Sequence, residues 1–393
     1  MTTQQKPTEA LVTSALIVWA RKRRSMSAEQ AADKLKVKPE IFEAWEKGEK
    51  RPTVRQAKDL AHIFSIPFGY LYLSTPPEER PAIPDLRTVS GAGGQPFSPE
   101  FIDTYHDVLR KQAWYKQELL SHGAARVPYV SRFSAETPPR IVAADLREAL
   151  ELNDAMRRQA NPWDAFLRTL IGQAEKIGIL VMRTGMVHNN THRTLDVQEF
   201  RGFAISDEYA PVVFINGRDA KSAQIFTFAH ELAHLWYGDS GISNPTYLQR
   251  TANNVNTKEQ VSDAVAAELL VPESTFRRTW NGGSDLEEHV DRLAEVFKVS
   301  SVVILRRALT FGLIDHQQFL ALYDNVANRR PKKAKGGDYF ANVVAGASQT
   351  IARALITAVS EGRTSHYEAA RLLNVSVTSL SGVAESVFGE ATI

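Results

Sequence analysis

The central motif of the chain is IFTFAHELAHLWYG, residues 225–238. This stretch is strongly helical and carries two histidines four positions apart. Residues at this spacing share one face of a helix, so the imidazoles of His230 and His234 can bind the same metal ion. In the H-E-x-x-H pattern the adjacent acid, Glu231, takes the proton of a metal-polarised water during peptide hydrolysis. We therefore predict a zinc-bearing helix. The alternative is an amphipathic helix with two half-buried histidines.

A hydrolytic zinc site also needs a third protein ligand and an open fourth position for water. The later helical stretch TKEQVSDAVAAELLVP, residues 257–272, offers Glu259 for this purpose in an E-x-x-x-D pattern. One turn further on, Asp263 can accept the free ring N–H of a ligating histidine and fix its tautomer. A solvated acidic face is the alternative for this pair, and Glu268 on the same segment competes for the ligand role.

The composition limits both the class of protein and the kind of metal site. The 393 residues, 43% hydrophobic and 23% charged, indicate a globular chain of two or three domains. The chain has no cysteine, so any metal must be held by histidine and carboxylate. A net charge of +2 is too small to indicate nucleic-acid binding by itself. Because neither a signal peptide nor a long apolar run is evident, we expect a cytoplasmic protein without a membrane partner.

The middle of the chain mixes helical and strand-like segments, which predicts an α+β domain. The strand APVVFING, residues 210–217, precedes the histidine helix, so it can pair a substrate backbone if it is an edge strand, or it can be a core strand. His289 and His316 are candidates for stabilising an oxyanion, although a surface or core position is the better expectation for each. The other segments are the helices RIVAADLREALEL (140–152) and PWDAFLRTLIGQAEKIG (162–178) and the strands ILVMRT (179–184) and FRGFAIS (200–206).

The N-terminal region has the pattern of a helix-turn-helix. A helix is expected from about Ala10 to Arg24. Ser27 and Gln30 then form a capping box that opens a short helix, and Pro39 at a first helical position starts another after the turn KVK. Two short helices across a tight turn fit the geometry that presents one helix to the major groove.

Local charge supports contact with phosphates at this region. Between Arg21 and Asp59 there are 12 Lys or Arg but 7 Asp or Glu. The cations that flank the two helices are the candidate DNA contacts, namely Lys36, Lys38, Lys50 and Arg51. Three glutamates on the same helix, Glu40, Glu43 and Glu46, would repel phosphates if they faced the groove. The alternative is a small helical module that docks on protein.

The order H-E-x-x-H, E-x-x-x-D and A-A-E-L-L-V-P resembles the ImmA/IrrE family of metallopeptidases, whose active-site core resembles that of thermolysin-type gluzincins. The likeness covers roughly residues 130–330. It implies that His230 and His234 are zinc ligands. It also implies that Glu231 is the catalytic acid/base and Glu259 the carboxylate ligand.

The sequence departs from this family at Ser262, Asp263 and Val265, where the family commonly has an Ala-Asn pair followed later by Phe. The stretch from about Val18 to Tyr72 resembles the Xre-type regulator domain, with WARKRRSMSAEQAADKL, EAWEKGEKRPT and the ending IPFGYLYLSTPP as its signature. In this family such a domain often precedes the peptidase.

Two stretches read as linkers, SGAGGQPFSP at 90–99 and the basic RRPKKAKGGD at 329–338. After the second, residues 338–362 predict one helix ended by Gly362, and residues 364–385 have a helix-turn-helix pattern. This tail either docks a partner or a second DNA site, or it covers a domain surface.

The expected fold is α+β and mostly helical, with a helix-turn-helix bundle, a gluzincin-like domain and a C-terminal helical domain. We predict domains at 1–80, 81–126 (a linker with a helix), 127–328 and 338–393.

The expected function is a zinc metalloendopeptidase, with Zn²⁺ as cofactor, that regulates transcription or a toxin-antitoxin-type response. Its partners would be DNA and a protein substrate such as a repressor or an antitoxin-like protein, and the repressor rests on family analogy alone. A homodimer is left open. The alternative is a DNA-binding regulator or antitoxin whose metallopeptidase-like domain is a sensor without turnover.

Overall fold

In the computed structural model the chain divides into two compact units, which are described separately. The first comprises Met1–Pro81 and Phe97–Ile102, and the second comprises Ala82–Pro96 and Asp103–Ile393. The structure describes residues 8–86, 97–160, 163–243, 257–282, 285–327 and 337–389. Most of the two expected linkers, at 90–99 and 329–338, lies outside these residues. The predicted four-segment division of the chain therefore stays a prediction.

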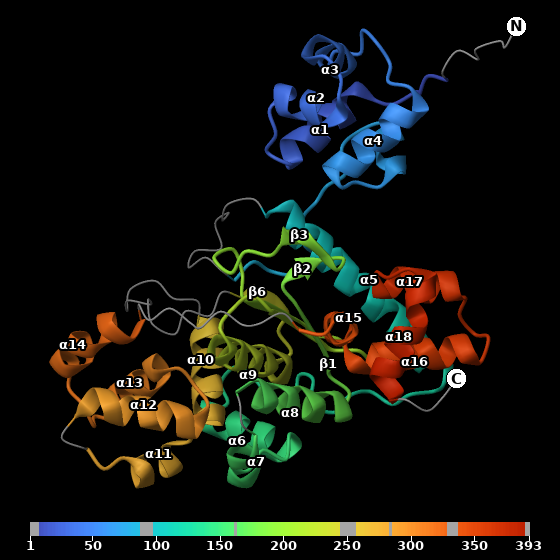
Figure 1. Cartoon of the computed structure of the whole chain (residues 1–393). Coiled ribbons are helices and arrows are strands. Elements are labelled where there is room, and N and C mark those ends of the chain that lie inside the picture. The colour runs from blue at the N-terminus through green and yellow to red at the C-terminus, as the bar shows by residue number, and fades with distance from the viewer. Residues whose placement is uncertain are drawn as a thin grey trace, which may run out of the picture. The chain divides into compact units, whose positions relative to one another are not determined.

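The first unit is a bundle of short helices around one apolar core, which contains Leu16, Phe42, Trp45, Leu60 and Phe64 among its buried side chains. Helices α2 and α3 on either side of the turn Lys36–Lys38 form the expected helix-turn-helix (Figure 1). The elements of this unit are α1 (Ser14–Arg23), α2 (Ala28–Leu35), α3 (Pro39–Glu46), α4 (Val54–Phe64) and the 3-10 helix η1 (Phe68–Tyr72).

Local sequence accounts for the start of α2, and a longer-range contact alters the start of α1. The Ser27 hydroxyl accepts from the Gln30 amide at 3.1 Å, and the Gln30 side chain accepts from the Ser27 amide at 2.9 Å. The expected helix from about Ala10 is wrong at its first turn, because α1 begins only at Ser14. Glu9 instead forms an isolated antiparallel bridge with Thr53, which ties the segment before α1 to the start of α4.

The second unit is built on a four-stranded mixed sheet in the order β1-β5-β4-β6. The expected strand 210–217 lies inside the sheet, because β5 runs parallel to β1 on one side and antiparallel to β4 on the other. It is therefore a core strand and not an edge. The strands are β1 (Leu180–Thr184), β4 (Gly202–Ile205), β5 (Val212–Asn216) and β6 (Gly241–Ser243), and a separate hairpin joins β2 (Met186–Val187) to β3 (Asn190–Thr194).

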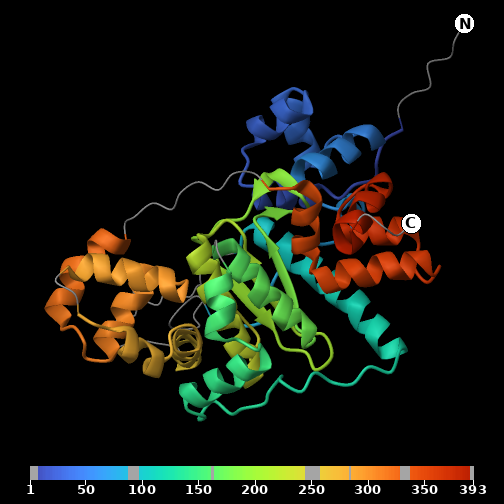
Figure 2. The ribbon, with the colours of Figure 1, turned by 60° about the horizontal axis from the view of Figure 1, so that its bottom comes forward.

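Helices cover both faces of this sheet (Figures 1 and 2). Because side chains alternate along a strand, Val213 and Ile215 join the core shared with α9 (Lys221–Tyr237), whereas Phe214 points to the other face. There its ring stacks on that of Phe203 at 4.7 Å, and Tyr105 of α5 (Pro99–Ser121) lies 5.8 Å from Phe203. Helix α9 is thus held directly against the sheet.

The outer edge of β6 is paired by a distant part of the chain. Asp85 forms a parallel bridge with Ile242, in which the Leu86 amide donates to the Ile242 carbonyl at 3.0 Å. The Leu86 side chain fills the place that a side chain at Gly241 would take, since a Cβ built on Gly241 would meet it at 2.2 Å. This strap of residues 84–86 extends the sheet by one strand segment.

The helices of the second unit form one apolar core with the sheet. Helix α9 packs against α8 and α10, and α10 packs against α6. These helices are α6 (Pro139–Ala149), α7 (Asp154–Gln159), α8 (Trp163–Lys176), α10 (Thr257–Leu270), α11 (Glu273–Thr279), α12 (Leu286–Phe297), α13 (Ser301–Thr310) and α14 (His316–Ala327).

The C-terminal segment is helical as expected, but the single helix expected over 338–362 is wrong. The structure has α15 (Tyr339–Ala347) and α16 (Gln349–Ser360), bent by 98° at Ser348. The break is fixed by a distant carboxylate, since Glu175 accepts from the Ser348 hydroxyl at 2.6 Å and from the Gln349 amide at 3.1 Å.

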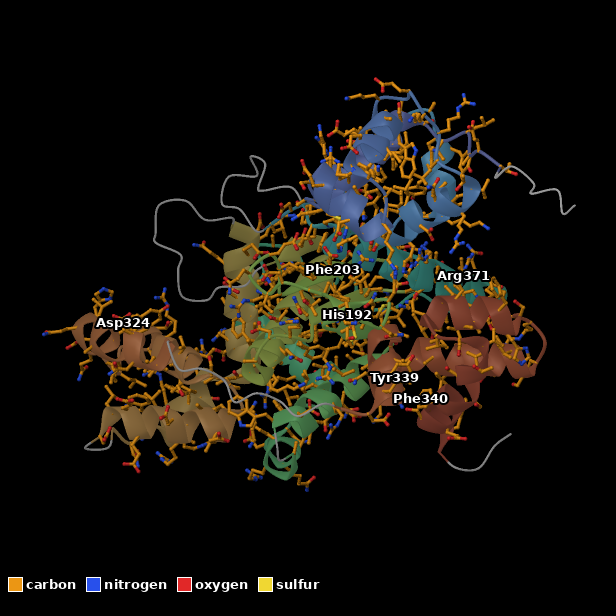
Figure 3. The ribbon with its side chains drawn as sticks, turned by 45° about the horizontal axis from the view of Figure 1, so that its top comes forward. His192, Phe203, Asp324, Tyr339, Phe340 and Arg371 are labelled. Carbon is orange, nitrogen blue, oxygen red and sulfur yellow. The ribbon has the colours of Figure 1, made fainter. Side chains whose placement is uncertain are left out.

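The later helices of this segment pack against α15. Tyr339 and Phe340 lie side by side there (Figure 3). The Phe340 ring occupies the space beside Gly382 of α18 (Leu380–Phe388), where a Cβ would meet it at 2.2 Å. Helix α17 (His366–Leu373) and the 3-10 helix η2 (Val377–Ser379) complete the segment.

Within the described residues no single helix is both long and apolar enough to span a membrane. The bent pair of α15 and α16 passes that test only when the two helices are taken together.

Candidate functional site

The two motif histidines lie on the most deeply buried helix of the sheet domain. Every residue of α9 from Gln224 to Trp236 is buried, so the helix has no solvent face. His230 and His234 are each 0% exposed, and their ring centroids lie 4.8 Å apart. Gly238, with φ of 75°, ends the helix in the left-handed conformation that glycine adopts without strain. The structure therefore brings the two imidazoles together in a dry interior.

The neighbouring helix α10 supplies the expected carboxylate. Glu259 Oε1 lies 3.0 Å from His234 Nε2, and its Oε2 lies 3.5 Å from His230 Nε2. The two Nε2 atoms are 3.0 Å apart. Glu259 is itself 0% exposed, so residues from two helices converge on one buried point. His230, His234 and Glu259 form a group whose ligand atoms all lie within 4.8 Å of one another.

Two further residues of α10 contact the outer nitrogens of the imidazoles. Asp263 Oδ1 lies 2.8 Å from His230 Nδ1, the contact expected for an acceptor that fixes the tautomer of a ligand. Ser262 Oγ lies 3.5 Å from His234 Nδ1, which the sequence analysis did not assign. Glu268, the rival ligand, points elsewhere, because it accepts from the Glu273 amide and pairs with Arg307.

The charges of the site are strongly coupled. Burial opposes charge on His230, but the carboxylate of Glu259 and the hydrogen bond of Asp263 outweigh it and hold the pKa of His230 well above its usual value. Burial also opposes charge on Glu259, yet the His230 charge and the two imidazole contacts lower the pKa of this carboxyl far below its usual value. Burial lowers the pKa of His234. The buried Glu259 carboxylate is therefore stabilised by positive charge at the imidazoles.

Glu231 is buried beside this group without a partner. It is 0% exposed, and neither carboxylate oxygen accepts a well-formed hydrogen bond within the described part of the chain, although the Ser243 hydroxyl is close enough to act on its pKa. Burial raises its pKa to about 8. Buried polar atoms are normally satisfied, so two unpaired oxygens beside three ligand atoms indicate a missing polar group or water.

Residues of two strands, neither of them predicted from the sequence, shape the space around Glu231. A Cβ built on Gly202 of β4 would lie 2.9 Å from Glu231 Oε1, so only glycine leaves room for the carboxylate. Ser243 of β6 is 0% exposed and its hydroxyl lies 3.4 Å from Glu259 Oε1. A glycine in a strand was the only available signal, since glycine there often marks a close approach.

The donor set fits zinc. Tetrahedral coordination with bonds of about 2.0–2.2 Å places ligand atoms roughly 3.3–3.6 Å apart. The distances of 3.0, 3.0 and 3.5 Å between the ligand atoms are within a few tenths of an ångström of that range. Two imidazoles and one carboxylate also match the ligand classes of catalytic zinc.

The two histidines considered for oxyanion stabilisation have other surroundings. His289 is buried against the Trp280 ring at 4.7 Å and contacts Arg292. His316 stacks on Phe319 at 6.3 Å at the start of α14. Both belong to helices other than those that carry the ligands, in agreement with the preferred surface or core interpretation.

The candidate DNA contacts form a second, separate set on the first unit. Lys36, Lys38, Lys50 and Arg51 are all exposed, and none of them forms an ion pair with a described residue. Lys36 ends α2 in the left-handed conformation, with φ of 55°, and Lys38 directly precedes the first turn of α3.

Two of the three glutamates of α3 that would oppose phosphate are neutralised by nearby cations. Glu46 accepts two hydrogen bonds from Arg21, at 2.7 and 3.1 Å. Glu43 lies 3.5 Å from Lys47. Glu40 stays exposed at the first turn.

Comparison with known families assigns three segments of the chain. Residues 174–309 match a peptidase family model described as the IrrE N-terminal-like domain, and residues 17–71 match a helix-turn-helix model. Residues 347–386 match a domain of unknown function. No curated protein matches the sequence. The first match contains the buried triad of His230, His234 and Glu259 together with Glu231. The second contains all four candidate DNA contacts.

Proposed function

We propose that this chain, which belongs to the ImmA/IrrE family and carries a helix-turn-helix domain at its N-terminus, is a zinc-dependent metallopeptidase that cleaves a regulatory protein. The observation that carries the proposal is the convergence of His230, His234 and Glu259 beside a buried glutamate without a partner. A repressor or an antitoxin-like protein is the substrate class that the family resemblance favours. Such a function assigns the protein to the cytoplasm.

His230, His234 and Glu259 would hold the zinc ion, which when bound acidifies a water molecule and polarises a carbonyl. Glu231 would act as the general base that accepts a proton from the attacking water. It then donates the proton to the amine that leaves when the peptide bond breaks. Burial raises the pKa of the Glu231 carboxyl, so its carboxylate is a stronger base than that of an exposed glutamate.

Positioning of the site depends on its neighbours. Asp263 fixes the ring of His230, so that Nε2 presents its lone pair toward His234 and Glu259. Gly202 leaves the Glu231 carboxylate unobstructed. In the first unit, Lys36, Lys38, Lys50 and Arg51 would contact the DNA backbone and hold the protein at its target.

The test compares the wild-type protein with Glu231→Gln, which keeps the shape of the side chain and removes its ability to take a proton. Zinc content is measured first and should be one ion per chain in both proteins. N-terminal peptides from cells that express each protein are then compared by mass spectrometry. The proposal predicts one defined new N-terminus with the wild type and none with the variant.

Glu273→Gln is the matched control, because Glu273 is an exposed glutamate that starts α11. It should give the same cleavage as the wild type. An identical set of N-termini from the wild type and from Glu231→Gln would contradict the peptidase function.

The complete burial of the triad favours a second candidate function, a DNA-binding regulator or antitoxin whose metal domain is a sensor without turnover. In that case Glu231→Gln keeps full regulation of a reporter gene, whereas Lys38→Gln and Arg51→Gln abolish it. Under the peptidase proposal, the single substitution Glu231→Gln is enough to abolish regulation of the reporter gene.

A further inference from the structure

A cavity of about 690 Å³ lies between α7, α11 and α12 of the second unit. Five of the residues that line it are cationic and two are acidic. The charged residues that line it are Arg157, Arg158, Arg278, Arg292, Lys298, Asp154 and Glu295. Its volume is in the range of small-molecule sites, roughly 300–1,000 Å³.

Arg157 is the buried member of this cluster. It is 4% exposed, and its Nε and Nη2 are buried without a hydrogen-bond partner in the described part of the chain. Its guanidinium carbon lies 5.9 Å from the ring of Phe166 and 5.3 Å from that of Phe297. The two rings therefore hold the guanidinium in place and leave its donors unused.

Burial, with a smaller effect from Arg147, lowers the pKa of Arg157 to about 10. That value is still well above neutral pH, so the side chain is charged in the cell. An isolated charge without hydrogen bonds is costly in a protein interior, which means that the site favours an anion.

Most of the surrounding cations have no acidic partner in the described part of the chain. Arg158 and Arg278 are exposed, and neither pairs with an acid among the described residues. Arg292 donates to the Asn281 side chain at 3.3 Å. Among the described residues, Lys298 is the one surrounding cation that pairs with an acid, Glu295 at 3.8 Å.

The acids of the lining do not satisfy Arg157. Glu295 accepts from the Trp163 indole at 2.9 Å and faces Lys298. Asp154 makes no ion pair with Arg157, although its charge acts on that guanidinium. Several guanidinium groups therefore share one cavity with an excess of positive charge.

We propose that this cavity binds a small ligand that carries phosphate groups. A carboxylate has two oxygens, and one guanidinium can bind both of them. A phosphate presents three or more oxygens and can bind several arginines at once. Val296 and Phe297 supply an apolar wall for the organic part of the ligand. A small phosphorylated ligand fits within a cavity of this volume, whereas duplex DNA would contact only its exposed cations, such as Arg158 and Arg278.

The test uses pyrophosphate and ATP as probes with the full-length protein, at constant ionic strength, and measures binding by calorimetry. The proposal predicts saturable binding of one ATP or pyrophosphate per chain. Arg157→Gln and Arg278→Gln should each weaken it at least tenfold.

Arg140→Gln is the matched control, because Arg140 is an exposed arginine of α6 that forms no ion pair with a described residue. It should leave the affinity unchanged. If Arg157→Gln does not fold, as judged by circular dichroism, the exposed Arg278→Gln and Arg292→Gln decide the question. Equal affinity in the pocket variants and in Arg140→Gln would overturn the proposal.

A second arm separates free phosphorylated ligands from the phosphates of DNA. Duplex DNA should bind the pocket variants as well as it binds the wild type. Loss of duplex binding in Arg278→Gln without loss of ATP and pyrophosphate binding would also overturn the proposal, because the cavity would then be part of a nucleic-acid surface.

Discussion

Asp263 Oδ1 lies 2.8 Å from Nδ1 of His230, at the outer side of the imidazole whose other nitrogen faces His234 and Glu259. The contact joins α9 to α10 through the interior of the domain. An aspartate at this place orients the ring and increases its basicity as a ligand.

Asp263→Ala should therefore lower the affinity for zinc by roughly 10- to 100-fold. Asp263→Asn keeps an oxygen that can accept the ring N–H, and its zinc affinity should stay close to that of the wild type. Competition with a chromophoric chelator measures both. Equal affinities for the wild type and Asp263→Ala would remove the positioning role from this residue.

Gly202→Ala should disrupt the space around Glu231. The new methyl group would lie 2.6 Å from Thr227 Cγ2, 2.8 Å from the Phe214 carbonyl and 2.9 Å from Glu231 Oε1. Relief requires β4 to shift, at a cost of about 1–3 kcal/mol in the free energy of unfolding. We expect cleavage of the substrate to be lost while the zinc content is retained.

Gly172→Ala is the control for that substitution, because no atom lies within 4 Å of a Cβ built there. Gly172 is inside α8, where alanine favours the helix by up to about 1 kcal/mol. Chemical denaturation should show a lower free energy of unfolding for Gly202→Ala than for the wild type, and a higher one for Gly172→Ala. A stable and fully active Gly202→Ala protein would refute the close approach.

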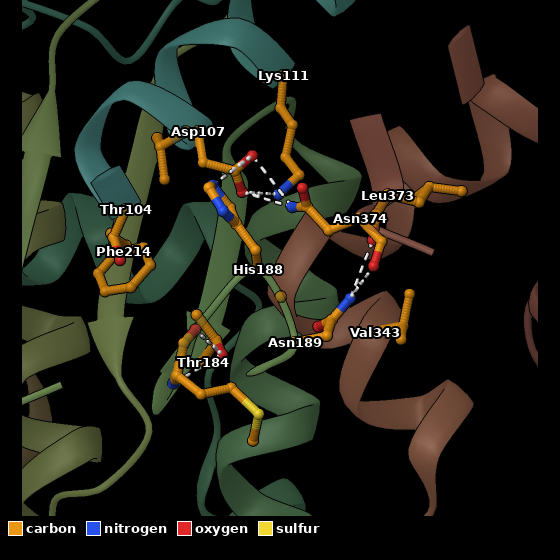
Figure 4. Close-up of a pocket in the computed structure, with 13 residues that line it drawn as sticks. Thr104, Asp107, Lys111, Thr184, His188, Asn189, Phe214, Val343, Leu373 and Asn374 are labelled. Atoms are coloured by element: carbon orange, nitrogen blue, oxygen red, sulfur yellow. Dashed lines mark hydrogen bonds and ion pairs between the residues drawn. The ribbon is translucent and has the colours of Figure 1, made fainter. Parts of the chain in front are cut away.

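Asp107 of α5 connects three parts of the second unit (Figure 4). Its carboxylate pairs with the buried Lys111, lies 3.8 Å from His188 in the β2–β3 turn and accepts from Asn374, which follows α17, at 3.0 Å. Asp107→Asn leaves the Lys111 ammonium buried without its counter-charge. The expected loss is about 3 kcal/mol in the free energy of unfolding.

This loss should depend on pH. Burial acts to raise the pKa of Asp107, but Lys111, His188 and Asn374 outweigh it, so the pKa in the folded protein is below the ordinary value of 3.8. The stabilisation is then present above about pH 4 and is lost as the pH falls through the lower, folded-state pKa. The free energies of unfolding of the wild type and Asp107→Asn, measured by urea denaturation, should become equal at acidic pH. A constant difference across that range would contradict this assignment.

Lys38→Gln and Arg51→Gln should weaken binding to duplex DNA of any sequence, because phosphate contacts carry no sequence information. Each change should reduce the slope of log affinity against log salt concentration by about 1. Fluorescence anisotropy with a labelled duplex measures the slope. Lys58→Gln, an exposed lysine of α4, is the control and should keep the slope of the wild type.

The sequence identified the parts of the site that repeat at helical spacing. His230 and His234 are one turn apart, and so are Glu259 and Asp263, so each pair could be placed on one helix face without a structure. Gly202 and Ser243 were not found, because they reach the site through strand pairing. The short strand β6 has only 3 residues and no pattern of its own.

Contacts between distant segments also explain the errors in the fold. Residues 338–362 have continuous helical periodicity, but Glu175, far earlier in the chain, accepts from Ser348 and Gln349 and bends the segment there. The pairing of Asp85 with Ile242 similarly depends on the tertiary fold. Such contacts leave no periodic signal in either segment.

The most direct test of the zinc centre is anomalous diffraction at the zinc edge from crystals of protein purified without chelators and supplied with one equivalent of zinc. We expect one strong peak, about 2.0–2.2 Å from a nitrogen of His230, a nitrogen of His234 and a carboxylate oxygen of Glu259. A zinc peak elsewhere, or no peak among these three side chains, would contradict it.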